Sequence, residues 1–133
     1  MCEKTFMRVF KGVLIMSTLI FPIAALGSGN IELGKKVFNK CKACHSIKPG
    51  KHKIGPSLHG IFGRVAGSSP GFRRYRGLRN AKWKWNKATL DEYLSDPKLY
   101  VRKNNDKRRS GMVLKLKKKR DRENIIEYLK VLK

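Results

Sequence analysis

The sequence predicts a small all-α fold in which a few helices are joined by long loops. Three segments carry apolar residues at helical spacing. The stretch from Ser46 to Asn80 is rich in Gly, Pro and Ser, and the chain contains no convincing pair of strands and no internal repeat. Because 133 residues suffice for one compact domain but not for two, a large multidomain enzyme is excluded.

The N-terminal segment has the pattern of an export signal. Three basic residues precede an apolar run, Val13–Leu26, that ends in small residues. We therefore expect residues 1–27 to be a secretory signal peptide and residues 28–133 to be the functional domain, located in the periplasm. An uncleaved anchor that keeps the domain membrane-associated is the alternative, but the apolar run is shorter than the roughly 20 residues that span a bilayer.

The chain is strongly basic. It contains 32 Lys+Arg against 9 Asp+Glu, which gives a net charge of +23 and a pI near 10.5. Removal of the export segment takes away three basic residues and one acidic residue, so the domain keeps a net charge of +21. Such a charge predicts attraction to acidic proteins, anionic lipid or nucleic acid. The expected export of the domain argues against nucleic acid as its partner.

The first helix is expected from about Asn30 to Lys40. Asn30 can cap its start, and Leu33, Val37 and Phe38 recur at helical spacing behind this cap. The helix leads directly into the first cysteine of the domain.

A second helix is expected to begin near Thr89, where Thr89 and Glu92 can form a capping box. It must stop before Pro97, because the residue before a proline is restricted to extended backbone. Its apolar residues are Leu90, Tyr93 and Leu94.

A third helix is expected from about Asp121 to Leu132. Acidic residues occupy its first turn, where they complement the helix dipole. Its apolar stripe comprises Ile125, Tyr128, Leu129 and Leu132. The long loop that lies before the second helix has a thin core of its own, so we expect the chain to fold around a large apolar cofactor.

Cys41, Cys44 and His45 identify that cofactor, because they form the pattern C-x-x-C-H, which is the attachment motif of c-type haem. Thiols three residues apart lie on one side of a helical turn and can both reach the haem vinyl groups, and the adjoining histidine is delivered under the iron. A zinc half-site and a thioredoxin-like dithiol are the alternatives. Zinc needs four ligands and thioredoxin a βαβ context, and the sequence contains neither.

Met112 is the first candidate for the opposite face of the haem iron, where Met, His and Lys are the usual ligands. The other three methionines belong to the export segment. A lone Met is more often a core residue, but Met112 lies next to Gly111 in a basic, loop-like stretch with no helical stripe to join. His52 and His59 are the competitors, and both follow His45 so closely that reaching the far face of a haem is difficult.

Several further segments occur in a specific order along the domain. They are Gly34–Phe38 before the cysteines, Gly55–Arg64, Pro70–Phe72, Trp85, Thr89–Leu94 with Pro97 and Tyr100, and Arg122–Lys130. Together with the C-x-x-C-H motif, this ordered set resembles the class I c-type cytochromes of the mitochondrial and alphaproteobacterial type. The resemblance covers nearly the whole domain. It implies the small cytochrome c fold, in which helices and long loops wrap around one covalently attached haem c.

The resemblance also implies how the haem is held. Cys41 and Cys44 would be the thioether anchors, and His45 and Met112 the axial ligands of the iron. The carbonyl of Pro56 would accept a hydrogen bond from the other ring nitrogen of His45, which fixes the tautomer of the imidazole and raises its basicity.

The same resemblance assigns roles around the haem. Leu58 would form part of the haem wall, Arg64 and Trp85 would hold a buried propionate, and Tyr93 would lie beside the sulfur of Met112. Without the resemblance, the two aromatic residues would be interpreted as core residues and Arg64 as a surface charge.

The sequence departs from the family pattern in three places. The basic segment Val101–Ser110 is an insertion where a short Pro-Gly turn is usual, which affects the register of Met112. Leu114 stands where an aromatic residue often covers the haem edge, and Arg74 where a propionate-binding Tyr is common. These changes alter solvent access and hence the redox potential.

The resemblance implies a soluble single-electron carrier of a respiratory chain, which shuttles electrons from a quinol-oxidising cytochrome bc complex to a terminal cytochrome c oxidase. It would not be an enzyme, because both axial positions of the iron are filled. Three alternatives remain open. They are an electron acceptor for a periplasmic dehydrogenase, a haem protein with ligand-binding or peroxidase-like activity if Met112 is not on the iron, and a basic nucleic-acid-binding protein without haem.

The expected partners are acidic docking surfaces on the membrane redox complexes, namely quinol–cytochrome c oxidoreductase and cytochrome c oxidase. Lys40, Lys53, Lys98 and Lys117 match the basic docking ring of the family. The run Lys117–Arg120 could also bind anionic lipid. We expect a monomer that does not bind nucleic acid.

Overall fold

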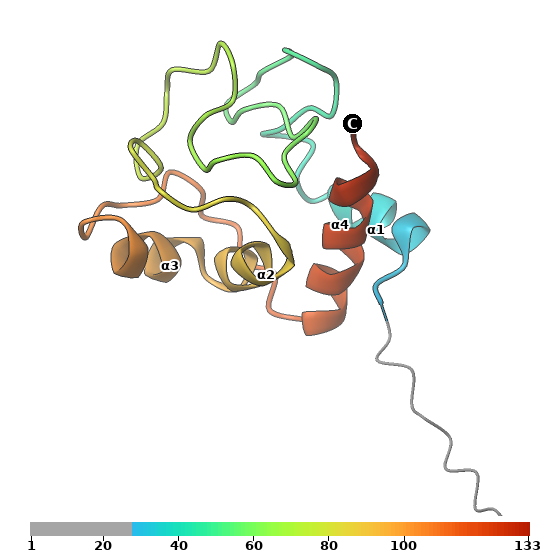
Figure 1. Cartoon of the computed structure of the whole chain (residues 1–133). Coiled ribbons are helices and arrows are strands. Elements are labelled where there is room, and N and C mark those ends of the chain that lie inside the picture. Colours follow the sequence, from blue (N-terminus) through green and yellow to red (C-terminus); the bar gives the residue numbers. More distant parts are fainter. Residues whose placement is uncertain (1–27) are drawn as a thin grey trace, which may run out of the picture.

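The computed structural model of the chain describes residues 28–133, which form four helices (Figure 1). The helices are α1 (Ile31–Phe38), α2 (Lys87–Ser95), α3 (Pro97–Asn104) and α4 (Lys119–Val131). Within this part of the chain the only β pairing is an isolated antiparallel bridge between Val65 and Lys84, so the all-α class is confirmed. None of the helices in residues 28–133 is both long and apolar enough to cross a membrane. The expected signal peptide, residues 1–27, lies outside the described residues.

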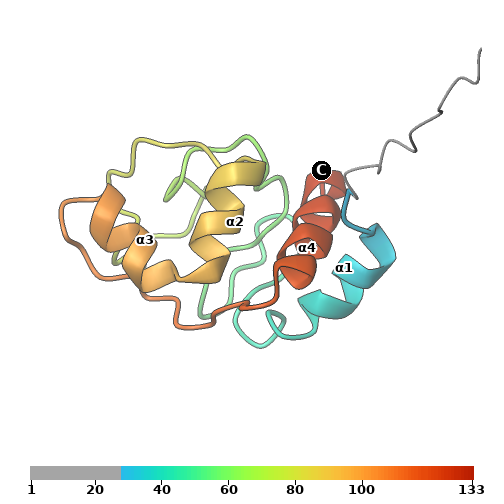
Figure 2. The ribbon, with the colours of Figure 1, turned by 90° about the horizontal axis from the view of Figure 1, so that it is seen from below.

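Helices α1 and α4 cross at very close range, as Figure 2 shows. A Cβ atom added to Gly34 of α1 would lie 2.1 Å from the carbonyl oxygen of Asn124 and 2.7 Å from Cβ of Tyr128, both in α4. Asn30 holds the start of α1 in place, because its side-chain oxygen accepts the N–H of Leu33 at 2.8 Å, and its own N–H donates to Oδ1 of Asn124 at 2.8 Å. Asn30 is therefore the N-cap of α1, as predicted.

The apolar face of α1 differs from the prediction. Leu33 is 41% exposed, whereas Gly34 and Val37 are the buried residues of the helix. The reason is the crossing at Gly34, which turns the face of α1 with Gly34 and Val37 toward α4 and leaves Leu33 at the edge. The helix also ends two residues before Lys40, at Phe38, and continues as a series of turns.

The start of α2 corrects the predicted capping box. The N-cap is Asn86, whose side chain accepts the N–H of Thr89 at 2.9 Å, while Thr89 Oγ accepts the N–H of Asn86 at 2.9 Å. Thr89 is therefore the last residue of the box and not its first, and Glu92 is not part of it. Asn is at least as good an N-cap as Thr, so the helix begins almost one turn earlier than expected. It ends at Ser95, before Pro97, as predicted.

Helix α3 was not predicted. Asp96 accepts the N–H of Leu99 at 3.1 Å, and Pro97 occupies the first helical position, where its missing N–H costs nothing. The first four residues of the segment expected to be a basic insertion, Val101–Ser110, therefore belong to a helix, and Val101 is fully buried. The Asp-Pro pair was the signal that could have revealed this helix.

Helix α4 begins two residues before the predicted Asp121 and ends at Val131. Its buried residues are Asn124, Ile125, Ile126, Tyr128 and Leu129. Leu132, the last residue of the predicted stripe, packs against the core from just beyond the helix. The predicted apolar face of this helix is thus confirmed.

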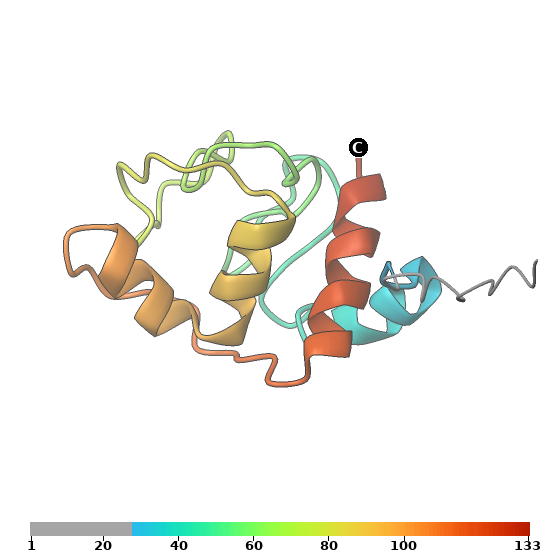
Figure 3. The same ribbon diagram turned by 60° about the horizontal axis from the view of Figure 1, so that its bottom comes forward.

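The segment between α1 and α2 forms a layer of loops on one side of the helices (Figure 3). Backbone hydrogen bonds connect its distant parts, such as Gly63 N–H to the oxygen of Trp85 (2.7 Å), Trp85 N–H to the oxygen of Arg64 (2.9 Å) and Ala66 N–H to the oxygen of Trp83 (2.9 Å). An aromatic contact joins the layer to the helices, because the ring centres of Trp85 and Tyr93 in α2 lie 4.8 Å apart, with the ring planes tilted by 59°. The loops and the helices thus enclose one continuous interior.

The close crossing at Gly34 leads to a testable prediction. Replacing Gly34 by Ala places a methyl group inside the contact distance of α4 and should destabilise the folded protein by about 1–3 kcal/mol, the usual cost of overpacking. The neighbouring Lys35→Ala, at an exposed position of the same helix, should change the free energy of unfolding by less than about 0.5 kcal/mol. Urea denaturation of both variants measures the difference, and equal stabilities would show that the crossing tolerates a side chain.

Candidate functional site

The interior holds a cavity of about 510 Å³, which is within the range of about 300–1,000 Å³ found for cofactor and ligand sites. Its walls come from the turn after α1, the loop layer, α2, the segment before α4, and α4 itself. The lining residues that carry the argument below are Cys41, Cys44, His45, Pro56, Leu58, Phe72, Arg74, Arg76, Trp85, Tyr93 and Met112. Most of the wall is apolar.

The two cysteines lie in a tight turn that follows α1. The N–H groups of Cys44 and His45 both donate to the carbonyl oxygen of Cys41, at 3.0 and 2.9 Å. Both cysteines are free thiols, Cys41 buried and Cys44 exposed, and both line the cavity. The turn therefore presents the two thiols and the imidazole to the same space, as the motif predicts.

The environment of Cys41 argues against the two alternatives considered for the cysteine pair. Burial raises the pKa of the Cys41 thiol to about 11, whereas redox-active dithiols have a lowered thiol pKa. Within residues 28–133 no group of three or more His, Cys, Asp and Glu side chains is placed to hold a metal ion. A thioredoxin-like dithiol and a zinc site are thus both disfavoured.

His45 has one ring nitrogen committed to the backbone. Its Nδ1 lies 2.7 Å from the carbonyl oxygen of Pro56, and because a carbonyl can only accept, Nδ1 carries the proton and Nε2 keeps its lone pair. Burial lowers the pKa of His45, which favours the neutral imidazole. A Cβ atom on Gly55 would lie 2.4 Å from Cε1 of this ring, so a glycine is needed for the ring to pack against the loop. The result is a fixed, neutral imidazole suited to ligate a metal through Nε2.

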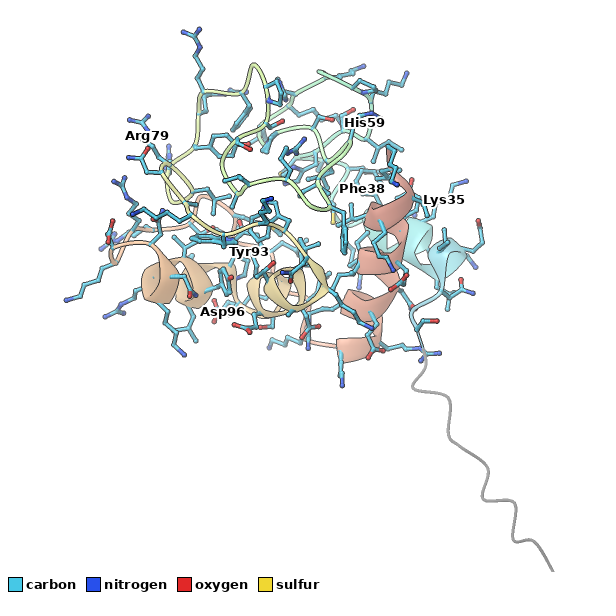
Figure 4. All side chains as sticks on the ribbon, viewed as in Figure 1. Lys35, Phe38, His59, Arg79, Tyr93 and Asp96 are labelled. Carbon is cyan, nitrogen blue, oxygen red and sulfur yellow. The ribbon has the colours of Figure 1, made fainter. Side chains whose placement is uncertain are left out.

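Met112 reaches the cavity from the segment that precedes α4. Its N–H donates to Oγ of Ser110 at 3.1 Å, and the same Oγ lies 3.4 Å from the hydroxyl of Tyr93 in α2. Figure 4 shows Tyr93 between α2 and the loop layer. Burial raises the pKa of Tyr93, so its hydroxyl stays protonated and can donate. The structure therefore brings Tyr93 and the segment of Met112 together at the cavity.

Leu58 and Trp85 also line the cavity, and both are almost fully buried. Arg64 is the exception among the predicted site residues, because it does not line the cavity. Its guanidinium donates to the carbonyl oxygens of His59 (2.9 Å) and Ser57 (3.2 Å). In this structure Arg64 stabilises the loop next to Leu58.

The competing histidines are engaged elsewhere. Nδ1 of His52 accepts the N–H of Ser57 at 3.1 Å, so its Nε2 carries the proton that points to the carbonyl oxygen of Pro70, 2.9 Å away. Both ring nitrogens of His52 are thus occupied by the backbone. Neither His52 nor His59 lines the cavity, which agrees with the preference for Met112.

Three lining residues of the loop layer had no assigned role. Phe72, Arg74 and Arg76 line the cavity, whereas Arg73 and Tyr75 do not. Every second residue from Phe72 to Arg76 therefore contributes to the wall of the cavity. The signal was present in the sequence as a run of basic and aromatic residues, but only the path of the loop shows which of them face the cavity.

The comparison with known proteins agrees with this site. The family model for cytochrome c matches residues 31–133. Cytochrome c2 of Rhodospirillum rubrum is 38% identical over 116 residues, which cover 83% of this chain and 86% of that protein. Cytochrome c2 of Rhodomicrobium vannielii is 32% identical over 124 residues, which cover 92% and 95%.

The solved structure of cytochrome c2 from Rhodospirillum centenum superposes with a TM-score of 0.72 at 33% identity, over 78% of this chain and 98% of that chain. The free thiols, the neutral imidazole and the apolar cavity form the donor set and the walls that a covalently attached haem requires. The chain therefore belongs to the cytochrome c family, as a class I c-type cytochrome, and its cofactor is the one covalently attached haem c of that family.

Proposed function

We propose that this protein is an exported carrier of single electrons whose haem c is bound by Cys41 and Cys44 and ligated by His45 and Met112. The observation that carries the proposal is that His45, with Nε2 free, and the thioether of Met112 line one apolar cavity together with both thiols. When bound, the haem supplies one-electron chemistry through its ferric and ferrous states. The remaining chemistry belongs to the residues that hold it.

Those residues favour a carrier over an enzyme. With His45 and Met112 both bound to the iron, no coordination position would be open to a substrate, and each of these two residues has its own support. The carbonyl of Pro56 holds the imidazole of His45, and Ser110 holds the backbone of Met112 next to Tyr93. A ligand set that changes little with oxidation state keeps the cost of electron transfer low, and the soft thioether of Met112 favours the reduced state.

The surface near the cavity fits a docking site for acidic partners. Lys53, Lys98 and Lys117 are exposed and form no ion pair within residues 28–133, while Lys40 is paired with Asp121 at 2.7 Å. Three of the four lysines of the expected docking ring therefore carry uncompensated charge. We infer that the partners are a quinol-oxidising cytochrome bc complex and a terminal cytochrome c oxidase, reached from the periplasm by the protein as a monomer.

Around the cavity there is also apolar surface. Ile54, which lines the cavity, is 75% exposed, and Val113, which also lines it, is 69% exposed. A small apolar rim within basic surroundings suits a transient complex, in which charge steers the encounter and a few apolar contacts bring the cofactors close. The run Lys117–Arg120 offers the same charge to anionic lipid, although Lys119 lies 3.9 Å from Glu123 and is partly compensated.

The ligation is tested by replacing Met112 with Ala. The variant should retain covalent haem, seen as an unchanged pyridine haemochrome spectrum, but should lose the sulfur-to-iron charge-transfer band of the oxidised protein, bind carbon monoxide when reduced, and have a lower midpoint potential. The control Leu114→Ala removes another side chain that lines the cavity and should retain the band.

The wild-type spectra decide between the functional classes. A c-type haemochrome with the sulfur band supports the carrier. The same haemochrome without this band, together with tight carbon monoxide binding, would indicate a ligand-binding or peroxidase-like haem protein. A folded protein without haem would contradict the proposal.

The docking proposal predicts a strong dependence on salt. Reduction of an oxidase by this protein should slow by roughly tenfold or more between a few millimolar and about 0.15 M salt, because a domain charge of +21 dominates the encounter at low ionic strength. Lys98→Gln should weaken this dependence more than Lys130→Gln, since Lys130 is already paired with Glu127 at 2.9 Å. A rate independent of salt would contradict the docking ring, and faster reduction by a periplasmic dehydrogenase than by the quinol-oxidising complex at low salt would favour the dehydrogenase alternative.

A further inference from the structure

The segment Phe72–Arg76 presents two arginines to the cavity. Phe72, Arg74 and Arg76, which are every second residue of this segment, line the cavity. The guanidinium of Arg74 donates to the carbonyl oxygen of Lys53, and its Cζ lies 5.5 Å from the centre of the Phe72 ring. These two contacts hold the cationic group of Arg74 at the edge of the cavity.

Arg76 lies on the side of Met112. Its Cδ atom is 3.8 Å from the position that a Cβ atom on Gly111 would take, so the stem of Arg76 runs beside the backbone just before Met112. The third cation of the lining, Lys40, is neutralised by Asp121. Arg74 and Arg76 form no ion pair within residues 28–133, which leaves their charges available to the contents of the cavity.

A haem carries two carboxylate groups, and a carboxylate in apolar surroundings requires a cation or several hydrogen-bond donors. Arg64 is poorly placed to serve, because it lies outside the cavity lining and donates to the carbonyl oxygens of Ser57 and His59. An arginine has five N–H donors in a fork that matches a carboxylate. The contact of Arg74 with Lys53 uses one of them and leaves the others free.

The loop that carries the two arginines is anchored by the segment Val101–Ser110. Asn105, which is 6% exposed, donates through Nδ2 to the carbonyl oxygens of Gly77 (2.6 Å) and Arg79 (3.1 Å). A Cβ atom on Gly77 would lie 2.5 Å from the carbonyl oxygen of Arg109 and 2.8 Å from Cγ1 of Val101. The segment Val101–Ser110, where this sequence departs from the family pattern, thus packs against and hydrogen-bonds the end of the loop that carries Arg74 and Arg76.

We propose that Arg74 and Arg76 bind the haem carboxylates in this protein, in place of Arg64, and that Asn105 is a positioning residue that holds their loop. The proposal rests on the haem site described under the proposed function. A positive charge next to the haem favours the addition of an electron, so the two arginines raise the midpoint potential. The loop supplies the two arginines that bind the carboxylates, and the Val101–Ser110 segment holds the loop in position.

The test is the midpoint potential of the holoprotein with Arg74→Gln and with Arg76→Gln. Arg73→Gln is the matched control, because Arg73 belongs to the same loop, is exposed and does not line the cavity. Both cavity variants should lower the potential by at least twice the shift of the control, and the difference should persist at about 1 M salt, where the Debye length is about 3 Å and exposed charges are screened. Arg64→Gln should shift the potential no more than the control.

Equal shifts for Arg73, Arg74 and Arg76, or a larger shift for Arg64 than for either cavity arginine, would overturn the assignment. These results are distinguishable from a failure of the proposed function. Equal shifts in a protein that keeps its c-type haemochrome and its sulfur band reject the arginines alone, whereas a missing haemochrome rejects the haem site itself.

The role of Asn105 is tested with a neighbour as control. Asn105→Ala should lower the potential in the same direction as Arg76→Gln, while Asn104→Ala should not, since Asn104 donates only to the carbonyl oxygen of Tyr100 in its own helix. In the double variant Arg74→Gln/Arg76→Gln, the additional change Asn105→Ala should have no further effect on the potential, because the groups that it positions are gone. An undiminished effect of Asn105→Ala in that background would overturn the positioning role.

Discussion

The contact between α1 and α4 at Gly34 is the constraint on which the rest of this structure depends. Because the backbone of α4 occupies the place of a Cβ atom at Gly34, the two helices can pack this closely only at a residue without a side chain. The turn of Cys41, Cys44 and His45 follows directly from the end of α1, so the crossing also determines where the thiols and the imidazole enter the cavity. The chemistry of the site is thus positioned by a packing contact that contains no reactive group.

The parts of the site that could be predicted are those encoded by local spacing. The C-x-x-C-H motif brings Cys41 and His45 to one cavity. Met112 could be predicted because it is the one methionine outside the expected export segment, and it lines the same cavity. The apolar face of α4 could be predicted because its apolar residues recur at helical spacing. The placement of Arg64 could not be predicted, because it depends on the path of its own loop, which turns the carbonyl oxygens of His59 and Ser57 toward the guanidinium. The predicted N-cap of α2 was wrong for a different reason. Asn86 and Thr89 are both good capping residues, and the sequence alone does not show which of them begins the helix.

The distribution of charge separates two regions of the domain. No Asp or Glu occurs between Leu33 and Leu90, so the loop layer carries basic residues without acidic neighbours in sequence. Of the five ion pairs in residues 28–133, four use an acidic residue of α2 or α4, as Asp91 does with Arg122 at 2.7 Å, and the fifth uses Asp96 between α2 and α3. Figure 4 shows Arg79 on the opposite side of the molecule from Lys35 of α1. The loop layer is therefore positively charged, with no carboxylate of its own to compensate the charge.

The support of Met112 comes from α2 on both sides of the residue. Before it, Ser110 meets Tyr93, and after it, Lys115 pairs with Asp96 at 2.5 Å and Leu116 donates to the carbonyl oxygen of Leu94 at 2.8 Å. The turn of His45, by contrast, is held by α1 and by the loop of Pro56. Met112 and His45 are thus held by different parts of the fold, on which their local stability depends. Under the proposed ligation, loosening of α2 would release the thioether of Met112 while the imidazole of His45 stays in place, so different parts of the fold control solvent access to the two faces of the cofactor.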